Sequence, residues 1–323
     1  MKAVVVDQFM LPSELRVSEA PEPQVGAGEV LVDVKAAGCN FADTLVVQGK
    51  YQEKPPFPFS PGSEIAGIVR QLGPGVTSFC PGERVFAYVK HGGFAERIAV
   101  PVDGVQPIPD GMSFEQAAAF PIAYGTSYAA VVQRGRTQPG ETLVVTAAAG
   151  GVGVAAVQIG KAVGARVIGL ASGDKLDVVT AAGADVAIDY RAEDWTEVLA
   201  RETGSEGINV VVENVGGEVF EACVRRMAWD GRLVVVGFAS GKIPELRINR
   251  VLLKHISIVG LFWGRTYQHE LHTVRSGFRA LASLYRQGKL APLVWKTFPI
   301  ENVAEALGLL GGRQSVGKIV LTI

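Results

Sequence analysis

Cysteine and histidine are scarce in this chain of 323 residues. The three cysteines, Cys39, Cys80 and Cys223, are far apart, odd in number and never spaced as a C-x-x-C pair, so the sequence predicts neither a disulfide framework nor a thiolate zinc site. Two of the four histidines, His269 and His272, occur as "HELH", whereas the zinc helix of metalloproteases requires H-E-x-x-H. We interpret this pair as a solvated helix start and expect no bound metal.

An excess of charge of either sign is also missing, as are long apolar runs. The chain has 31 basic and 32 acidic side chains, interspersed along its length, which argues against a general nucleic-acid or membrane surface. No apolar run approaches the ~20 residues of a membrane span, and the start "MKAVVVDQF" reaches Asp7 too early for a signal peptide. These absences predict a cytoplasmic protein whose partners are small molecules or copies of itself.

Hydrophobic residues make up 48% of the chain, which is enough for two domain cores. Residues 1–122 contain many Gly and Pro residues between short β-rich runs, a texture typical of an antiparallel, barrel-like β domain. Residues 123–263 alternate apolar strand-like runs with helix-length segments, which predicts an α/β domain with a doubly wound parallel sheet. Residues 264–323 end in "GKIVLTI", and we expect this tail to return to the first domain.

Six strand candidates follow one another in the α/β region. They are "TLVVTA", "ARVIGLA", "DVAIDY", "INVVVEN", "RLVVVGF" and "ISIVGLF". The last of them, within "HISIVGLFWG", can form an unpaired edge that extends the sheet across a two-fold axis, so we expect a homodimer.

The stretch "TAAAGGVGVAA" links the first of these strands to a helix-like segment. It has no nucleophile, acid or metal ligand, so it contributes only backbone N–H groups and space, which suits an anion at a helix N-terminus. Against the pattern G-x-G-x-x-G, the first glycine is Ala148 and the other two are present. The strand–turn–helix context predicts a dinucleotide diphosphate here, and the alternative is a merely tight turn. The predicted contacts are Gly150, Gly151, Val152 and Gly153.

The residues after the second strand bear on which dinucleotide binds. An NAD site has an acid there for the ribose 2′-hydroxyl, but "RVIGLA" ends at Ala171 and Ser172. Ser172 and Lys175 can instead receive a 2′-phosphate, with Tyr190 at the end of the third strand within reach, so we expect NADPH. The alternatives are an ordinary solvated lysine at 175 and a displaced ribose ligand at Asp174.

Six motifs occur together over essentially the whole chain. They are "NFAD" (40–43), "PGSEIAGIV" (61–69), "GGFAE" (92–96), "AAAGGVG" (147–153), "AIDYR" (187–191) and "VGFASG" (236–241). In this combination the chain resembles the zinc-free medium-chain dehydrogenase/reductase superfamily, and within it the NADPH:quinone oxidoreductases related to ζ-crystallin. The resemblance implies a GroES-like β-barrel catalytic domain formed from both chain ends, a Rossmann domain between them, and a cofactor in the cleft.

The resemblance also implies site residues. Asn40 and Asp43 would line the cleft near the nicotinamide, and Tyr51 would donate a hydrogen bond to the substrate oxygen. The cofactor contacts would include Thr126, Asn214, Gly237, Phe238, Phe262, Trp263 and Arg313, and Phe41 would add a flat apolar wall for a planar acceptor. Alternatives remain open, because Asn40 and Asp43 can cap a helix, the aromatic rings can be core, and Arg313 can be an exposed loop residue. Leu45 and Ala123 depart from the family pattern, so acceptor and cofactor contacts can differ.

The same comparison excludes alcohol dehydrogenase chemistry. In the zinc-dependent relatives a cysteine ligand stands where Asn40 is and a histidine ligand where Ser63 is, and both changes remove a metal-binding atom. Without a Lewis acid, no group would stabilise an alkoxide at neutral pH. A quinone is already an electrophile and needs only a positioned hydride donor. We therefore predict an NADPH-dependent quinone reductase, with an enone or alkenal reductase and a non-catalytic NADPH-binding protein as alternatives.

Overall fold

The structure, a computed structural model, describes residues 1–323 and divides them into two compact units. Unit 1 consists of Met1–Ile122 and Pro292–Ile323, and unit 2 consists of Ala123–Ala291. The chain therefore crosses between the units twice, after Ile122 and after Ala291. No helix has the length and apolar character that crossing a membrane would require.

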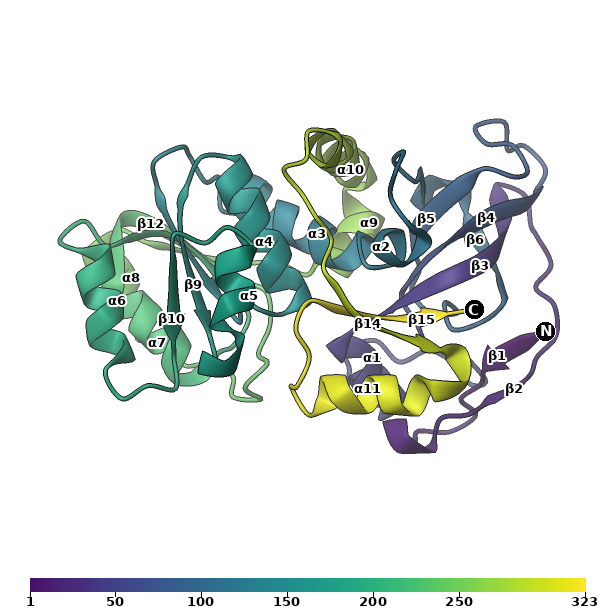
Figure 1. Ribbon diagram of the computed structural model, residues 1–323, viewed down its shortest axis with the longest axis horizontal. Coiled ribbons are helices and arrows are strands. Elements are labelled where there is room, and N and C mark those ends of the chain that lie inside the picture. The colour runs from purple at the N-terminus through teal and green to yellow at the C-terminus, as the bar shows by residue number, and fades with distance from the viewer. The chain divides into compact units, whose positions relative to one another are not determined.

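Unit 1 is built on a sheet to which both ends of the chain contribute (Figure 1). Its strands are β3 (Glu29–Cys39), β4 (Glu64–Leu72), β5 (Arg84–Tyr88), β6 (Arg97–Pro101), β7 (Val105–Pro107), β14 (Val294–Pro299) and β15 (Lys318–Thr322), beside a small sheet of β1 (Lys2–Val4) and β2 (Val17–Glu19). The order is β14-β15-β3-β4-β5-β7, with β6 also paired to β3. Because β15 runs antiparallel to β3, with Ile319 opposite Cys39, the C-terminal tail is part of the first domain.

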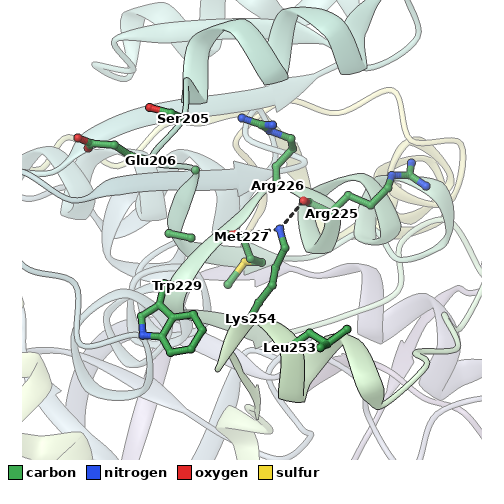
Figure 2. A pocket seen from close by; sticks show the side chains of 10 residues that line it. Ser205, Glu206, Arg225, Arg226, Met227, Trp229, Leu253 and Lys254 are labelled. Carbon is green, nitrogen blue, oxygen red and sulfur yellow. Dashed lines mark hydrogen bonds between the residues drawn. The ribbon is translucent and has the colours of Figure 1, made fainter.

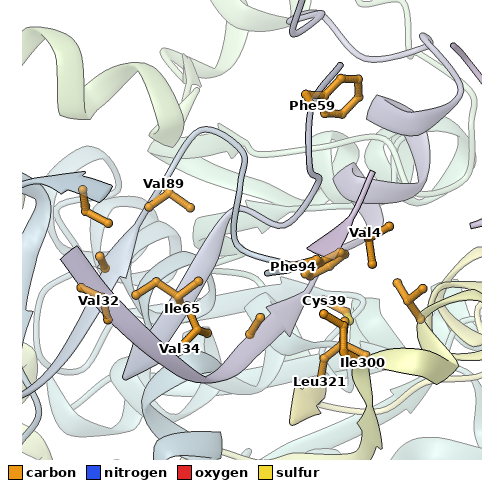
Figure 3. Packing of buried hydrophobic residues seen from close by; sticks show 14 of the residues in the cluster. Val4, Val32, Val34, Cys39, Phe59, Ile65, Val89, Phe94, Ile300 and Leu321 are labelled. Carbon is orange, nitrogen blue, oxygen red and sulfur yellow. The ribbon is translucent and has the colours of Figure 1, made fainter. Parts of the chain in front are cut away.

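The core of unit 1 also joins the two ends of the chain. Val32 on β3 and Ile65 on β4 belong to the same buried cluster as Phe94, Ile300 and Leu321 (Figure 3). The helices of this unit are α1 (Phe41–Val47), α2 (Phe114–Ala118) and α11 (Val303–Gly311). Since residues before 123 and after 291 bury one another's apolar side chains, neither segment forms this core alone.

Unit 2 is a Rossmann domain, as the sequence predicted. Its strands are β8 (Thr142–Thr146), β9 (Arg166–Ala171), β10 (Val186–Asp189), β11 (Ile208–Glu213), β12 (Met227–Val235) and β13 (Ser257–Gly260). All neighbouring pairs are parallel, in the order β10-β9-β8-β11-β12-β13. The helices are α3 (Pro121–Tyr128), whose first two residues belong to unit 1, and α4 (Gly151–Ala162), α5 (Leu176–Ala181), α6 (Trp195–Thr203), α7 (Gly217–Arg226), α8 (Asn249–Lys254), α9 (Trp263–His269) and α10 (Leu271–Arg286). The order reverses between β8 and β11, which is the switch point where such sheets bind ligands.

The end of unit 2 lies at Ala291 and not at residue 263, where the sequence analysis drew it. The reason is the amphipathic helix α10, whose buried side chains Val274, Phe278 and Leu281 recur at helical spacing on one face. Phe278 packs against Trp263, with 6.2 Å between the ring centroids, so this face is covered by unit 2. The return to unit 1 therefore begins only after this helix.

Candidate active site

The glycine turn leaves β8 and enters α4 at the carboxyl edge of the unit 2 sheet. Gly150 is the N-cap of α4 and has an extended conformation, with φ −78° and ψ 173°. A Cβ atom at Gly153 would overlap the Ala147 carbonyl oxygen and the Ala148 backbone, so the close approach of helix and strand requires glycine there. A Cβ atom at Gly150 would lie 3.4 Å from the Ala147 carbonyl oxygen and near nothing else. The protein's own packing therefore does not require glycine at position 150.

A buried carboxylate accepts several hydrogen bonds at the switch point beside this turn. Glu213, at the end of β11, has no exposed surface and accepts hydrogen bonds from the Thr146 hydroxyl (2.9 Å) and from the Val215 and Gly216 N–H groups (2.8 and 2.9 Å). Burial raises the pKa of Glu213, while these donors oppose the shift. The Asn214 amide donates to the Thr146 carbonyl at 2.8 Å, which ties the ends of β8 and β11 together. The predicted cofactor residue Asn214 therefore lies beside the glycine turn.

The segment after β9 carries the predicted ribose residues. Ser172 is buried, and a hydrogen bond from its hydroxyl is the main cause of the lowered pKa of Asp174. Lys175 lies near a second cation, Arg191, because the positive charge of Arg191 contributes to the lowered pKa of Lys175 after the larger effect of burial. Tyr190 directly follows β10 and packs against the buried cluster of unit 2. Two cations, the Ser172 hydroxyl and the Asp174 carboxylate therefore lie close together in this segment.

The predicted aromatic residues differ in their surroundings. Phe238 and Phe262 are 37% and 41% exposed, whereas Trp263 is 7% exposed. A Cβ atom at Gly125 would overlap the Trp263 ring, so this indole packs directly on α3. Thr126, the next residue of α3, is buried. The Trp263 ring thus supports the helix that carries Thr126. Gly237 lies next to Phe238, and its N–H donates to the Glu213 carbonyl at 3.2 Å.

Unit 1 contains a buried ionic cluster around Asn40. The Lys318 ammonium donates to Glu64 Oε1 (2.6 Å), to Asn40 Oδ1 (2.7 Å) and to the Cys39 carbonyl (2.7 Å). Asn40 Nδ2 in turn donates to Glu64 Oε1 at 2.9 Å. Glu64 has no exposed surface and Lys318 is 6% exposed, so each charge depends on the other. The Asn40 amide is therefore held by two charged side chains, and Asn40 is also the N-cap residue of α1.

Asp43, the third residue of α1, also makes hydrogen bonds at the start of this helix. Its carboxylate accepts the Asn40 backbone N–H at 2.7 Å and the Ser63 hydroxyl at 3.2 Å. Burial raises the pKa of Asp43 to about 7, and the Asn40 N–H donor and the Lys318 charge oppose the rise. The charge of Asp43 also contributes to the raised pKa values of Tyr51 and Tyr88, although burial is the main cause for both phenols. Tyr51 and Tyr88 thus lie in the electrostatic field of Asp43.

We expect the stability of the protein to depend on pH through Asp43. The stability that this carboxyl contributes is fully present below its ordinary pKa of 3.8 and is lost as the pH rises through about 7. In D43N the amide cannot ionise. Between about pH 5 and 8 the free energy of unfolding should therefore fall by roughly a few kcal/mol less than in the wild type, and the melting temperature should fall less as well. Calorimetry of both proteins over this range checks the expectation, and parallel profiles would contradict it.

The unit 1 cluster does not fit a zinc ion. At the two positions where the zinc-dependent proteins have ligands, Asn40 offers an amide that is bonded to Glu64 and Lys318, and Ser63 offers a hydroxyl that is bonded to Asp43. Neither group is a thiolate or an imidazole. No group of three or more His, Cys, Asp or Glu side chains in the chain is arranged to hold a metal ion. His269 and His272 are exposed, on either side of the junction between α9 and α10.

A pocket of about 180 Å³ lies at the amino end of β12 (Figure 2). Met227, the first residue of that strand, lines it together with Trp229, Leu253 and Lys254, and the Lys254 ammonium donates to the Arg225 carbonyl at 2.6 Å. The glycine turn is at the opposite, carboxyl edge of the same sheet. Because parallel sheets bind ligands at their carboxyl edge, this pocket is not the candidate cofactor site.

Sequence reasoning missed four residues that the structure places beside predicted site residues, two in each unit. Glu213 is an acid at the end of the buried run "INVVVE", and Arg191 ends "AIDYR", so both were visible as charges at strand ends. Glu64 and Lys318 are 254 residues apart, and no local pattern pairs them. Arg313, a predicted cofactor residue, lies in the loop between α11 and β15 with φ 56°, and its role remains a prediction.

Two protein-family models match the chain. The Alcohol dehydrogenase GroES-like domain matches residues 26–110, and the Zinc-binding dehydrogenase model matches residues 151–278. The quinone oxidoreductase-like protein 2 homolog of Nematostella vectensis is 41% identical over 92% of this chain and 82% of its own. The quinone oxidoreductase-like protein 2 of Rattus norvegicus is 40% identical over 100% of this chain and 92% of its own.

The solved structures include a similar protein with a bound dinucleotide. The Escherichia coli quinone oxidoreductase complexed with NADPH has a TM-score of 0.92 to this chain at 28% identity, with 100% of each chain covered. The similarity extends over both units, including the tail that returns to unit 1.

Proposed function

The chain belongs to the quinone oxidoreductase family of medium-chain dehydrogenases/reductases, and on that premise we propose that it transfers hydride from NADPH to quinones without zinc. The observation that carries the proposal is the turn from β8 into α4. A Cβ atom at Gly150 would meet only the Ala147 carbonyl oxygen, so no other protein atom requires glycine there. The turn also lies beside the switch point of the sheet.

The groups of unit 2 would hold the cofactor, which supplies the hydride. Backbone N–H groups of Gly151, Val152 and Gly153 would face the diphosphate beside Gly150, whose own N–H donates to the Ala147 carbonyl at 3.0 Å. Thr126 and Asn214 would contact the nicotinamide half. The exposed rings of Phe238 and Phe262 would provide flat apolar walls, with Trp263 behind α3. Unit 1 would supply the groups for the acceptor.

The acceptor oxygen gains charge during hydride transfer and needs hydrogen-bond donors. A phenol with its ordinary pKa of 10.0 is already protonated at neutral pH, and burial raises the pKa of Tyr51 further, so its hydroxyl would serve as a donor to that oxygen. Asp43 has a pKa of about 7, so it is able both to hold and to release a proton near neutral pH. Asn40 is fixed by Glu64 and Lys318 and would position the start of α1. We propose Asn40, Asp43 and Tyr51 as the residues that serve the acceptor.

A panel of acceptors tests the proposed activity. Purified protein is incubated with NADPH and either quinones or enones while the absorbance of the reduced nicotinamide is followed. We expect saturable oxidation of NADPH with quinones. Faster turnover of enones would favour a reductase of carbon–carbon double bonds, and saturable NADPH binding without any turnover would indicate a non-catalytic NADPH-binding protein.

We expect NADPH to be preferred over NADH because of the cations near Ser172. Replacing Lys175 and Arg191 together by alanine should raise the KM for NADPH by roughly 100-fold and leave the KM for NADH nearly unchanged, since each charged hydrogen bond to phosphate contributes about 1.5–3 kcal/mol. Arg201→Ala, a change of an arginine that is 70% exposed on α6, is the matched control. Equal losses with both dinucleotides would contradict the assignment.

We also propose that the protein is a homodimer formed through β13. This strand is an edge of the unit 2 sheet, and the apolar side chains of Ile248, Leu252 and Leu253 before it are more than 70% exposed. An unpaired edge with apolar neighbours suits antiparallel pairing with a second copy. Light scattering should therefore give twice the chain mass of 34.2 kDa, and Ile258→Lys should give the single chain. A wild type that is monomeric at micromolar concentration would refute the pairing.

A further inference from the structure

The side chain of Gln158, on α4, makes hydrogen bonds that the proposed chemistry does not use. Its Oε1 atom accepts the Tyr124 hydroxyl at 2.8 Å and the Ala291 N–H at 3.0 Å. Its Nε2 atom donates to the Ala291 carbonyl at 3.0 Å. Both lone pairs of the amide oxygen are thus occupied, and both backbone groups of Ala291 are paired with one side chain.

These two partners flank the two chain crossings between the units. Tyr124 is the second residue after the first crossing, and Ala291 is the last residue before the second. All three residues belong to unit 2, so the hydrogen bonds are internal to it. Gln158 is therefore hydrogen-bonded to unit 2 residues at both chain crossings.

The same helix begins at the glycine turn. Gly151 and Gln158 are seven positions apart, which puts them on one face of α4 about two turns apart. The Ser127 hydroxyl donates to the Val152 carbonyl at 2.7 Å, so α3 is bonded to the first turn of α4 as well as to Gln158. On the unit 1 side of the first crossing, Glu64 Oε2 accepts a hydrogen bond from the Ile122 N–H at 2.8 Å.

We propose that Gln158 is a positioning residue that fixes the unit 2 side of both chain crossings on the helix that begins at the glycine turn, and that turnover depends on this fixation. Its effect on turnover rests on the proposed function, whereas its effect on the crossings does not. Loss of the amide should loosen the crossings and slow the reaction while leaving the glycine turn able to bind NADPH.

The test compares hydrogen exchange and kinetics in the full-length wild type and Gln158→Leu. We expect the Ala291 amide to exchange about tenfold faster in the variant, while amides of β8 and β9 keep their rates. The kcat should fall about tenfold or more, because small errors in positioning cost much of the rate, and the NADPH dissociation constant should change less than about threefold. Gln158→Glu keeps the acceptor and loses the N–H donor, so its effects should be intermediate.

Two further variants make the result decisive. Gln71→Leu, the same change at an exposed position on β4, should leave exchange at Ala291 and kcat unchanged. Tyr124→Phe should keep the protection of Ala291 and lower kcat less than Gln158→Leu. Unchanged exchange at Ala291 in Gln158→Leu, or faster exchange with an unaltered kcat, would overturn the inference. If the wild type reduces no acceptor, the proposed function fails, and exchange at Ala291 still decides whether Gln158 holds the crossing.

Discussion

Replacing Lys318 by methionine is expected to lower the melting temperature by roughly 10 °C, because it leaves the Glu64 carboxylate buried without its cation. Breaking a buried ion pair from one side typically costs about 3–5 kcal/mol. The change also removes the donor to Asn40 Oδ1 and to the Cys39 carbonyl, so Asn40 should lose its fixed orientation. We therefore expect a loss of turnover as well as of stability, measured by calorimetry and by the rate of NADPH oxidation.

Two controls separate the ion pair from the size of the side chain. Lys35→Met, at an exposed position on β3, should change the melting temperature by less than about 1 °C, since surface substitutions usually have small effects. The double variant with Glu64→Gln removes both charges and should recover more than half of the lost stability. A melting temperature of Lys318→Met within about 2 °C of the wild type would show that the cluster does not depend on this pair.

Gly150→Ala is expected to weaken NADPH binding by roughly 30- to 100-fold while leaving the melting temperature of the free protein nearly unchanged. The extended backbone at Gly150 accepts any residue, and the added Cβ would meet only one carbonyl oxygen, at 3.4 Å. A bound diphosphate would occupy that space, so the methyl group should cost about 2–3 kcal/mol in binding. Fluorescence titration of both proteins with NADPH measures the change.

Gly153→Ala provides the contrast. A Cβ atom there would overlap backbone atoms of Ala147 and Ala148, so this variant should lose both stability and binding. An affinity for NADPH in Gly150→Ala equal to that of the wild type would mean that the diphosphate does not approach this residue. Loss of stability in both variants alike would mean that the turn needs glycine only for its own packing.

The Rossmann fold was predictable because its signals are local. Each of the six strands contains a short apolar run, and the glycine turn lies between a strand and a helix, so periodicity and spacing sufficed. The end of unit 2 was misplaced because the amphipathic pattern of α10 requires a partner but does not identify it. Contacts within the fold, such as that between Phe278 and Trp263, assign the helix to unit 2.

The candidate site residues were predictable in part, because short motifs are visible in the sequence and contacts between distant residues are not. Asn40, Asp43 and the glycine turn lie in short motifs that the chain itself displays. The atoms that fix Asn40 come from Lys318, close to the other end of the chain, and this pairing depends on how β15 lies beside β3. The sequence left open whether Asn40 and Asp43 serve the reaction or cap a helix. In the structure the Asp43 carboxylate accepts the Asn40 backbone N–H at the start of α1, and the Asn40 side chain binds Glu64 and Lys318.

Titration of the purified full-length protein with NADPH, followed by nicotinamide fluorescence, tests the central claim most directly. We expect saturable binding with one site per chain, micromolar affinity as a rough estimate, and a marked weakening in Gly150→Ala. An absence of saturable binding of either NADPH or NADH to the folded wild type would contradict the account.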